Sequence, residues 1–235
     1  MSTLDESVLG NLGPKKAISE LGHMLDEKFE KHLLLSFDEL SIYLTSKQQK
    51  CIERLLELKP TDFERSMPYY GIDEPDPKNN FKILTDTIKN TDTGKPITKS
   101  RAIPNHIYSA FLKLNNSIKS DHHNGLEIVS AYRSPARQAL LTFYYLDLFD
   151  FDASRVFSRV ALPGYSEHGL VEETALDLDY TLEHPKDYDD LLFANRPEYD
   201  WLEKHARKFG FTLSYPPNNK YNLSFEPWHW RYVGK

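Results

Sequence analysis

The sequence predicts an α+β fold, a small antiparallel sheet with flanking helices preceded by a mainly helical N-terminal region. In the first part of the chain, apolar residues recur at spacings of three and four, as they do in amphipathic helices. From about residue 101, patterns of this kind alternate with short apolar runs of strand type. A chain of 235 residues has room for two domains. We therefore expect a helical extension, residues 1–100, and a second domain, residues 101–235.

Two helices are expected in the N-terminal region. Between Pro14 and Leu35 one apolar stripe comprises Ile18, Leu21, Leu25, Phe29 and Leu33. The stretch SKQQKCIERLLELKP predicts a second helix, in which Ser46 and Gln49 form a capping box and Pro60 ends the helix. Between about Thr61 and Lys99 we expect loops or a connection rather than a core element, because polar residues, proline and glycine predominate there.

The second part mixes helices and strands. PNHIYSAFLKLNNSIKS has one apolar helical face, and LEIVSAY, after Gly125, reads as a strand. SPARQALLTFYYLDLF predicts a helix with Ser134 as N-cap and Pro135 in its first turn. TALDLDY alternates with period two, which places Asp177 and Asp179 on the same strand face. RPEYDWLEKHARKFGFTLSYP predicts a helix that ends at Gly210 and is followed by a strand.

Composition excludes several classes of partner. Hydrophobic residues at 40% and charged residues at 27% are ordinary for a globular protein. The net charge of -6, from 35 acids and 29 bases, argues against binding to nucleic acid or an anionic membrane surface. No run reaches the roughly 18 apolar residues of a membrane span, and the first residues do not read as a secretory signal. Cys51 is the only cysteine, so we expect a cytoplasmic protein without an intrachain disulfide.

Three segments carry residues suited to metal chemistry: SAYRSPARQ, GYSEHGLVEETALDLDY and FEPWHWRYVG. Catalytic zinc takes three protein ligands from His and Asp or Glu, keeps a fourth position for water, and needs a nearby carboxylate that accepts the water proton. His168, Asp177, His229 and Glu226 are of these types. Their spacing alone does not define a site, because the helical HExxH signature is not present.

These segments resemble the D-alanyl-D-alanine carboxypeptidase family of zinc peptidases, which includes the vancomycin-resistance carboxypeptidases and shares its fold with the hedgehog signalling domain. The resemblance rests on a Ser-x-His, an Ala-x-Asp and a Glu-x-x-His pattern, with an upstream Tyr-Arg-Ser and a Gln five residues after that Arg. The matching residues here are Ser166, His168, Ala175, Asp177, Glu226, His229, Tyr132, Arg133, Ser134 and Gln138. The resemblance makes residues 101–235 a zinc carboxypeptidase domain, on which the N-terminal extension is expected to pack.

The resemblance also implies the roles of individual residues. It implies one zinc ion bound by His168, Asp177 and His229, with Glu226 as the catalytic base. It implies that Arg133 binds a substrate carboxylate or the developing oxyanion, which would make this residue both catalytic and substrate-binding. The further substrate contacts expected are Gln138, Ser166 and Tyr132, from this pattern, and Trp228, which flanks His229.

The chain departs from the family pattern between the two proposed ligands of the middle segment. Eight residues separate His168 from Asp177, two more than is usual in the family, and Glu173 stands where a glycine is expected. We interpret GLVEE as an enlarged loop. Asp179 is therefore a rival ligand on the same strand face, and the Ala-x-Asp context favours Asp177.

The last segment needs a bend. In an extended strand, residues three apart point to opposite faces, so Glu226 and His229 can address one metal only if the backbone turns between them. Pro227 fixes its own φ and restricts the residue before it, which predicts a turn at this point. Trp228 and Trp230 flank His229 and are expected to exclude water around it.

The function implied by the resemblance is removal of the C-terminal D-alanine from peptidoglycan stem peptides or muropeptides. We expect an LD-carboxypeptidase that acts on tetrapeptides in murein recycling, because a cytoplasmic enzyme that trimmed pentapeptide precursors would damage the cell's own wall synthesis. Glu172 and Glu173 are expected to contact the amine of a diamino acid. The alternatives are a DD-carboxypeptidase on pentapeptides, a phage-type endopeptidase and a non-catalytic zinc-binding module. The oligomeric state is open.

Overall fold

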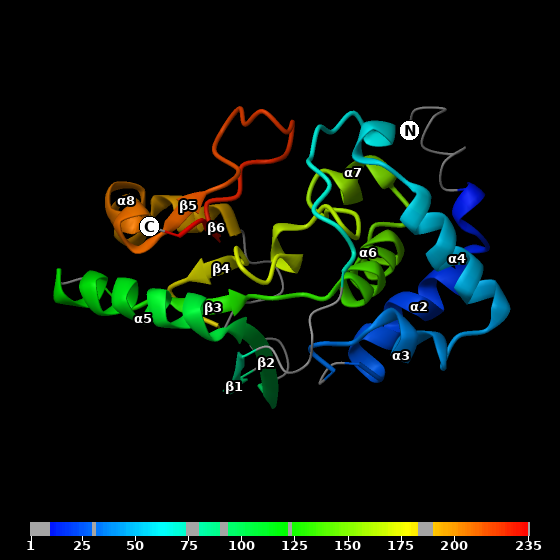
Figure 1. The fold of residues 1–235 in the computed structure, drawn as a ribbon, viewed down its shortest axis with the longest axis horizontal. Coiled ribbons are helices and arrows are strands. Elements are labelled where there is room, and N and C mark those ends of the chain that lie inside the picture. Colours follow the sequence, from blue (N-terminus) through cyan, green and yellow to red (C-terminus); the bar gives the residue numbers. More distant parts are fainter. Residues whose placement is uncertain are drawn as a thin grey trace. The chain divides into compact units, whose positions relative to one another are not determined.

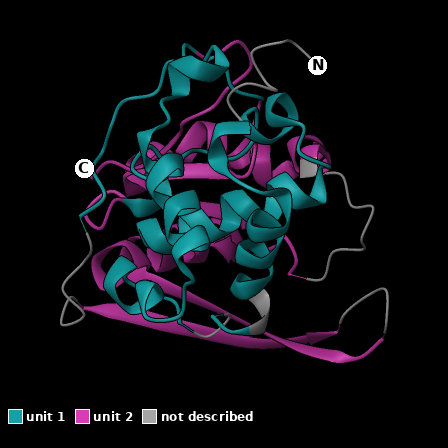
Figure 2. Ribbon diagram, turned by 90° about the vertical axis from the view of Figure 1, so that its right-hand side faces the viewer, with its two compact units in different colours: residues 1–77, 133–169, 220–224 teal, residues 78–132, 170–219, 225–235 magenta. Residues whose placement is uncertain are grey.

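The computed structural model describes residues 10–29, 32–73, 80–89, 94–121, 124–182 and 190–234 (Figure 1). The chain forms two compact units, and each is assembled from three segments (Figure 2). Unit 1 consists of residues 1–77, 133–169 and 220–224, and unit 2 consists of residues 78–132, 170–219 and 225–235. Helices and small antiparallel sheets are both present, so the predicted α+β class is confirmed.

Unit 1 is helical. Its helices are α2 (Lys15–Glu27), α3 (Phe37–Ser41), α4 (Ser46–Glu57), α6 (Pro135–Leu148) and α7 (Ala153–Phe157), with the short 3-10 helices η1 (Pro60–Phe63) and η2 (Glu167–Gly169). The expected helix from Pro14 to Leu35 was too long at its C-terminal end, since α2 ends at Glu27. Phe29 and Leu35 are nevertheless buried in the core. The helical spacing continued past Glu27 because the chain beyond the helix still packs against the same core.

The capping box of α4 lies one residue earlier than predicted. The backbone N–H of Gln48 donates to Thr45 Oγ1 at 3.3 Å, and the Thr45 N–H donates to Gln48 Oε1 at 2.9 Å. Thr45 and Ser46 are both good N-cap residues, and each is followed by Gln three residues later. The local pattern therefore fits both registers, and the structure uses the one that begins at Thr45.

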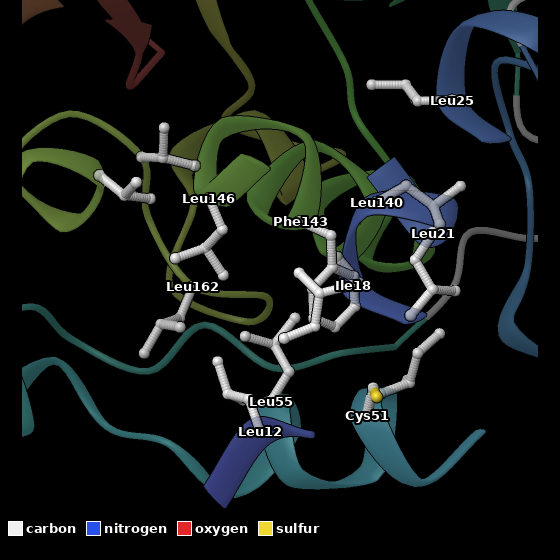
Figure 3. Close-up of a cluster of buried hydrophobic side chains, with 14 of the residues drawn as sticks. Leu12, Ile18, Leu21, Leu25, Cys51, Leu55, Leu140, Phe143, Leu146 and Leu162 are labelled. Carbon is white, nitrogen blue, oxygen red and sulfur yellow. The ribbon is translucent and has the colours of Figure 1, made fainter. Parts of the chain in front are cut away.

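The core of unit 1 lies where α2, α4 and α6 meet (Figure 3). Helix α6 contributes Leu140, Phe143 and Leu146, all fully buried. As predicted, Ser134 caps α6, accepting from the Arg137 N–H at 3.3 Å. Its hydroxyl also donates to the carbonyl of Leu35 at 2.6 Å. The N-terminal helices and α6 therefore share one core and one buried hydrogen bond.

Unit 2 contains the sheets. Its elements are β1 (Phe81–Lys89), β2 (Pro96–Pro104), α5 (Asn105–Ser120), β3 (Glu127–Ser130), β4 (Ala175–Asp179), η3 (Asp190–Asn195), α8 (Pro197–His205), η4 (Ala206–Phe209), β5 (Phe211–Leu213) and β6 (His229–Tyr232). The predicted helices α5 and α8 and strands β3, β4 and β5 are confirmed. Gly210, at the end of η4, has φ +89, and a Cβ there would lie 2.7 Å from the ring of Tyr232.

The main sheet has the strand order β3-β4-β6-β5, and every neighbouring pair is antiparallel. Strands β4 and β6 are therefore central. Leu176 faces Trp230 in the register of these two strands, and both side chains are buried in the core that α5 and α8 complete. The central strands thus carry one buried apolar pair, and the next pair along them consists of the ionisable residues Asp177 and His229.

A second sheet was missed. Residues 61–99 were expected to form loops, but β1 and β2 pair over nine residues each as an antiparallel hairpin. An ion pair between Arg101 and Asp86 and a hydroxyl contact of 3.1 Å between Thr85 and Ser100 join the strands. Much of β1 is exposed, so its sequence does not alternate between apolar and polar residues as a half-buried strand does.

The compact units do not follow the predicted boundary after residue 100, because α6 packs with the N-terminal helices. The division of roles between residues 1–100 and 101–235 stays a prediction. Among the described residues, none of the helices combines the length and the apolarity that crossing a bilayer requires.

We expect Ser134→Ala to lower the free energy of unfolding by about 2 kcal/mol, because it removes a helix cap and the buried hydrogen bond to Leu35. Urea denaturation followed by circular dichroism measures the change. Ser36→Ala is the matched control, since Ser36 caps the short helix α3 through the Glu39 N–H. The control should lose about 1 kcal/mol or less. Equal losses in the two variants would contradict the role of the Leu35 contact.

Candidate active site

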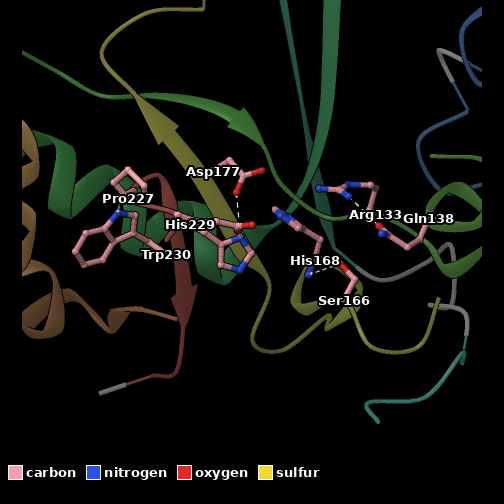
Figure 4. A network of polar contacts seen from close by, with 9 residues as sticks. Arg133, Gln138, Ser166, His168, Asp177, Pro227, His229 and Trp230 are labelled. Atoms are coloured by element: carbon pink, nitrogen blue, oxygen red, sulfur yellow. Dashed lines mark hydrogen bonds and ion pairs between the residues drawn. The ribbon is translucent and has the colours of Figure 1, made fainter. Parts of the chain in front are cut away.

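The residues with ionisable and hydrogen-bonding side chains named above form two groups, one in each unit. In unit 2 the first pair comes from the central strands, where β4 places Asp177 opposite His229 of β6. His229 Nδ1 lies 3.1 Å from Asp177 Oδ1 (Figure 4). His229 is only 4% exposed, and Asp177 is half-buried. The imidazole and the carboxylate therefore meet in a site that is largely shielded from water.

Glu226 joins this pair through a turn. The His229 N–H donates to the carbonyl of Glu226 at 3.1 Å, which closes a turn around Pro227 and Trp228. The predicted bend is confirmed. It brings Glu226 Oε2 to 3.7 Å from His229 Nδ1, although the two residues are three apart. Two carboxylates consequently face the same imidazole nitrogen, an arrangement suited to holding a cation or moving a proton.

Aromatic residues fix the orientation of His229. The ring of Tyr215 lies 4.7 Å from the His229 ring, at an interplanar angle of 32°. The Glu226 N–H donates to the Tyr215 carbonyl at 3.1 Å, so Tyr215 supports both residues. Trp230 is buried, and Trp228 is half-buried beside the turn. Tyr215 was not identified as a site residue from the sequence, where its only signal is its position after β5 and before a proline.

Asp179, the rival ligand, lies elsewhere on β4. Its Oδ1 accepts a hydrogen bond of 2.6 Å from the Tyr180 N–H, and its register partner is Glu127 of β3. Asp177 is the aspartate that stands opposite His229. Two residues along a strand correspond to about 6.6 Å, a separation too large for the two carboxylates to replace each other without a register shift.

The acids of the enlarged loop contact other parts of unit 2. Glu173 forms an ion pair with Arg231 of β6. Glu172 accepts a hydrogen bond at its carbonyl from His106 Nε2 at 3.1 Å, and its exposed carboxylate lies 3.8 Å from the same nitrogen. The charge of Glu173 is therefore balanced within the protein, and the expected contact with a diamino acid is left to Glu172.

The group in unit 1 is built around Arg133. Its Nη1 donates to Gln138 Oε1 at 2.8 Å (Figure 4). Gln138 Nε2 donates to the carbonyl of Ala161 at 2.6 Å. Gln138 is 2% exposed. The buried amide thus holds the guanidinium in place, which indicates a supporting role in addition to the substrate contact that the sequence predicted.

His168 also belongs to unit 1. Its carbonyl accepts from the Arg133 N–H at 2.9 Å, and its own N–H donates to Ser166 Oγ at 3.3 Å. The turn is closed by the Gly169 N–H, which donates to the Ser166 carbonyl at 3.0 Å. The Ser-x-His segment is therefore a compact turn, and its backbone is attached to the residue that carries the guanidinium.

Tyr132, the residue before Arg133, lies in unit 2. Its backbone N–H donates to the Ala102 carbonyl at 2.9 Å, and its ring packs against Phe81 of β1 at 4.9 Å. The side chain is 4% exposed. These contacts attach the hairpin to the strand that leads to Arg133. The substrate contact predicted for Tyr132 stays a prediction.

Comparison with known proteins gives consistent results. Residues 100–235 match the family model described as VanY, D-alanyl-D-alanine carboxypeptidase. YodJ of Bacillus subtilis (strain 168), named as a candidate carboxypeptidase, is 34% identical over 117 residues, 47% of this chain and 39% of YodJ. The bifunctional D-Ala-D-Ala dipeptidase and carboxypeptidase VanXYC of Enterococcus gallinarum is 34% identical over 114 residues, 46% of this chain and 56% of VanXYC. The chain thus spans less than two thirds of either relative.

Two solved structures are also similar. The LdcB LD-carboxypeptidase is 26% identical, with a TM-score of 0.47, and the match covers 72% of this chain and 71% of LdcB. A VanY D,D-pentapeptidase mutant from a VanB-type resistance cassette, in complex with Zn(II), is 23% identical with a TM-score of 0.45. That match covers 67% of this chain and 81% of the VanY chain.

Proposed function

The chain belongs to the D-alanyl-D-alanine carboxypeptidase family, and from this premise we propose that it is a zinc metallocarboxypeptidase that removes the C-terminal D-alanine from peptidoglycan stem peptides. One observation carries the proposal. Asp177 and Glu226 both face Nδ1 of His229, at 3.1 Å and 3.7 Å, in a shielded site. Two carboxylates and an imidazole nitrogen supply ligands for a cation together with a base beside it.

We propose that His168, Asp177 and His229 hold one zinc ion. Among the described residues, these three are the set whose side chains could hold a metal, and Asp177 and His229 already lie together in unit 2. Two imidazoles and one carboxylate are a donor set that zinc accepts while it keeps a position for water. When bound, zinc polarises the peptide carbonyl and lowers the pKa of a coordinated water to about 7.

Glu226 is the proposed base. Its carboxylate lies beside His229 and is largely buried, so a proton taken from water is not lost to solvent. The same carboxyl group then delivers the proton to the leaving amine. The turn at Pro227 fixes this geometry because it holds the backbone of Glu226 against that of His229.

Arg133 is the proposed partner of negative charge on the substrate. A free C-terminal carboxylate, or the oxyanion that develops during attack, needs a fixed cation. Gln138 accepts from one guanidinium nitrogen and is itself held by Ala161, so the guanidinium is oriented before substrate arrives. Ser166, Tyr132 and Trp228 stay proposed substrate contacts.

We further propose that the preferred substrate is a tetrapeptide, which makes the enzyme an LD-carboxypeptidase of murein recycling in the cytoplasm. The exposed carboxylate of Glu172 can meet the cationic amine of a diamino acid, whereas Glu173 is paired with Arg231. A DD-carboxypeptidase acting on pentapeptides is the second candidate, because the family description and VanXYC both refer to D-Ala-D-Ala. Glu226 beside His229 argues against a module that only binds zinc.

Asp177→Ala should weaken zinc binding far more than Asp179→Ala, by at least about 100-fold in the dissociation constant, because it removes a direct ligand. Competition with a chromogenic chelator measures the constants. Asp179→Ala is the matched control from the same strand, and its constant should change by less than about 10-fold, since Asp179 accepts from the Tyr180 N–H instead. The reverse ranking would show that the register of the enlarged loop assigns the ligand differently.

Glu226→Gln should retain zinc and lose turnover, with kcat lower by about 10²- to 10⁴-fold, because an amide cannot accept the water proton. Metal content and hydrolysis are measured on the same preparation. Removal of zinc by a chelator should abolish hydrolysis by the unaltered protein, and added zinc should restore it. Full activity of the Glu226→Gln variant would contradict the proposed mechanism.

The substrate assignment is tested by kcat/KM on tetrapeptide and pentapeptide stems, each with a free or an amidated C-terminus. We expect a preference for the tetrapeptide and a loss of at least about 10-fold on amidation, since the carboxylate partner of Arg133 is then neutral. A preference for the pentapeptide would establish the DD alternative. Undiminished cleavage of amidated peptides would indicate an endopeptidase.

A further inference from the structure

We propose that the N-terminal region takes part in the site, with Tyr70 as a positioning residue for the ligand His168. The proposal rests on the proposed zinc site for the role of His168, and on contacts within unit 1 for everything else. The segment Ser66–Ile72 lies across the loop Gly164–Gly169 and is called the strap below. It lies outside residues 100–235, the part that the family model matches.

The strap contacts the start of the loop through its backbone. The Tyr70 N–H donates to the carbonyl of Gly164 at 2.7 Å, and the ring of Tyr69 packs on that of Tyr165 at 5.2 Å. Gly164 has φ +83, and a Cβ there would lie 2.6 Å from Tyr69 Cε2 and 3.3 Å from the Gly71 carbonyl. The loop can approach the strap this closely only because residue 164 is a glycine.

The strap also contacts the end of the loop, beside the proposed ligand. The Tyr70 hydroxyl donates to Glu167 Oε1 at 3.3 Å. Glu167 is 2% exposed, and a buried carboxylate is costly unless it accepts hydrogen bonds. Glu167 directly precedes His168 within η2. The phenol therefore helps to hold the turn that presents the imidazole.

The strap is itself anchored. Just before it, Phe63 stacks on Phe157 with ring centroids 3.9 Å apart, and Arg65 Nε donates to the Phe157 carbonyl at 3.4 Å. The N–H of Ser66 donates to the Tyr221 carbonyl at 3.3 Å. The strap is thus held at its start and is bonded to the loop at Gly164 and at Glu167. It can therefore restrict the motion of His168, which follows Glu167.

Tyr70 acts through Glu167 rather than through substrate, so its loss should affect metal affinity and kcat more than KM. Tyr70→Phe keeps the ring and removes the hydroxyl. We expect the zinc dissociation constant to rise by about 10-fold, as for other groups that orient a ligand. Chelator competition measures it. Tyr69→Phe is the matched control, because it keeps the ring that packs on Tyr165, and its constant should stay within about 2-fold of the original value.

The possible results distinguish a failure of the proposed role of Tyr70 from a failure of the proposed zinc site. An unchanged zinc constant in Tyr70→Phe overturns the proposal, and so does a raised KM with unchanged kcat. If the unaltered protein binds no zinc, the proposed function fails, and amide hydrogen exchange of residues 166–169 in the metal-free protein still tests the strap. Faster exchange in Tyr70→Phe than in Tyr69→Phe supports it, and equal rates overturn it. Gly164→Ala should speed exchange at the same amides, because a side chain there displaces Tyr69.

Discussion

The candidate site depends on the antiparallel register of β4 and β6. Residues directly opposite in such a pair have Cβ atoms about 4.5–5.5 Å apart, which is how Asp177 meets a histidine that lies 52 positions later. A slip of one residue would turn side chains to the other face of the sheet. The neighbouring pair, Leu176 and Trp230, is buried in the core, so a slip would also expose apolar surface. The burial of Leu176 and Trp230 in the core of unit 2 therefore fixes the register that places Asp177 opposite His229.

The second feature of this site is the negative charge that surrounds His229. The carboxylates of Asp177 and Glu226 lie 3.1 Å and 3.7 Å from one nitrogen of His229, which is largely buried. Both carboxylates would attract a cation bound there, which is the physical reason for proposing a metal at Asp177 and His229. Elsewhere on the sheet, the carboxylate of Glu173 is paired with Arg231 of β6.

Some helices and the bend before His229 could be predicted from the sequence, because the residues that determine each of them lie within one short stretch. Helix α5 follows from its apolar spacing, and helix α6 follows from its N-cap Ser134 and the proline after it. The bend before His229 follows from the rule that residues three apart in a strand diverge. The hairpin could not be predicted in this way, since much of β1 is exposed and its residues do not alternate regularly between apolar and polar. Contacts such as that of Gln138 with the Ala161 carbonyl, or of Tyr70 with Glu167, join distant positions and leave no local pattern.

The core that α6 shares with α2 and α4 makes the two parts of the chain depend on each other for stability. The family pattern covers residues 100–235, yet the apolar side of α6, with Leu140, Phe143 and Leu146, is buried against helices that precede that range. Each such side chain contributes about 1.5–3 kcal/mol when it is removed from water. Residues 100–235 on their own would therefore expose the apolar side of α6 to water, so the stability of the part that carries the family pattern depends on the helices that precede it.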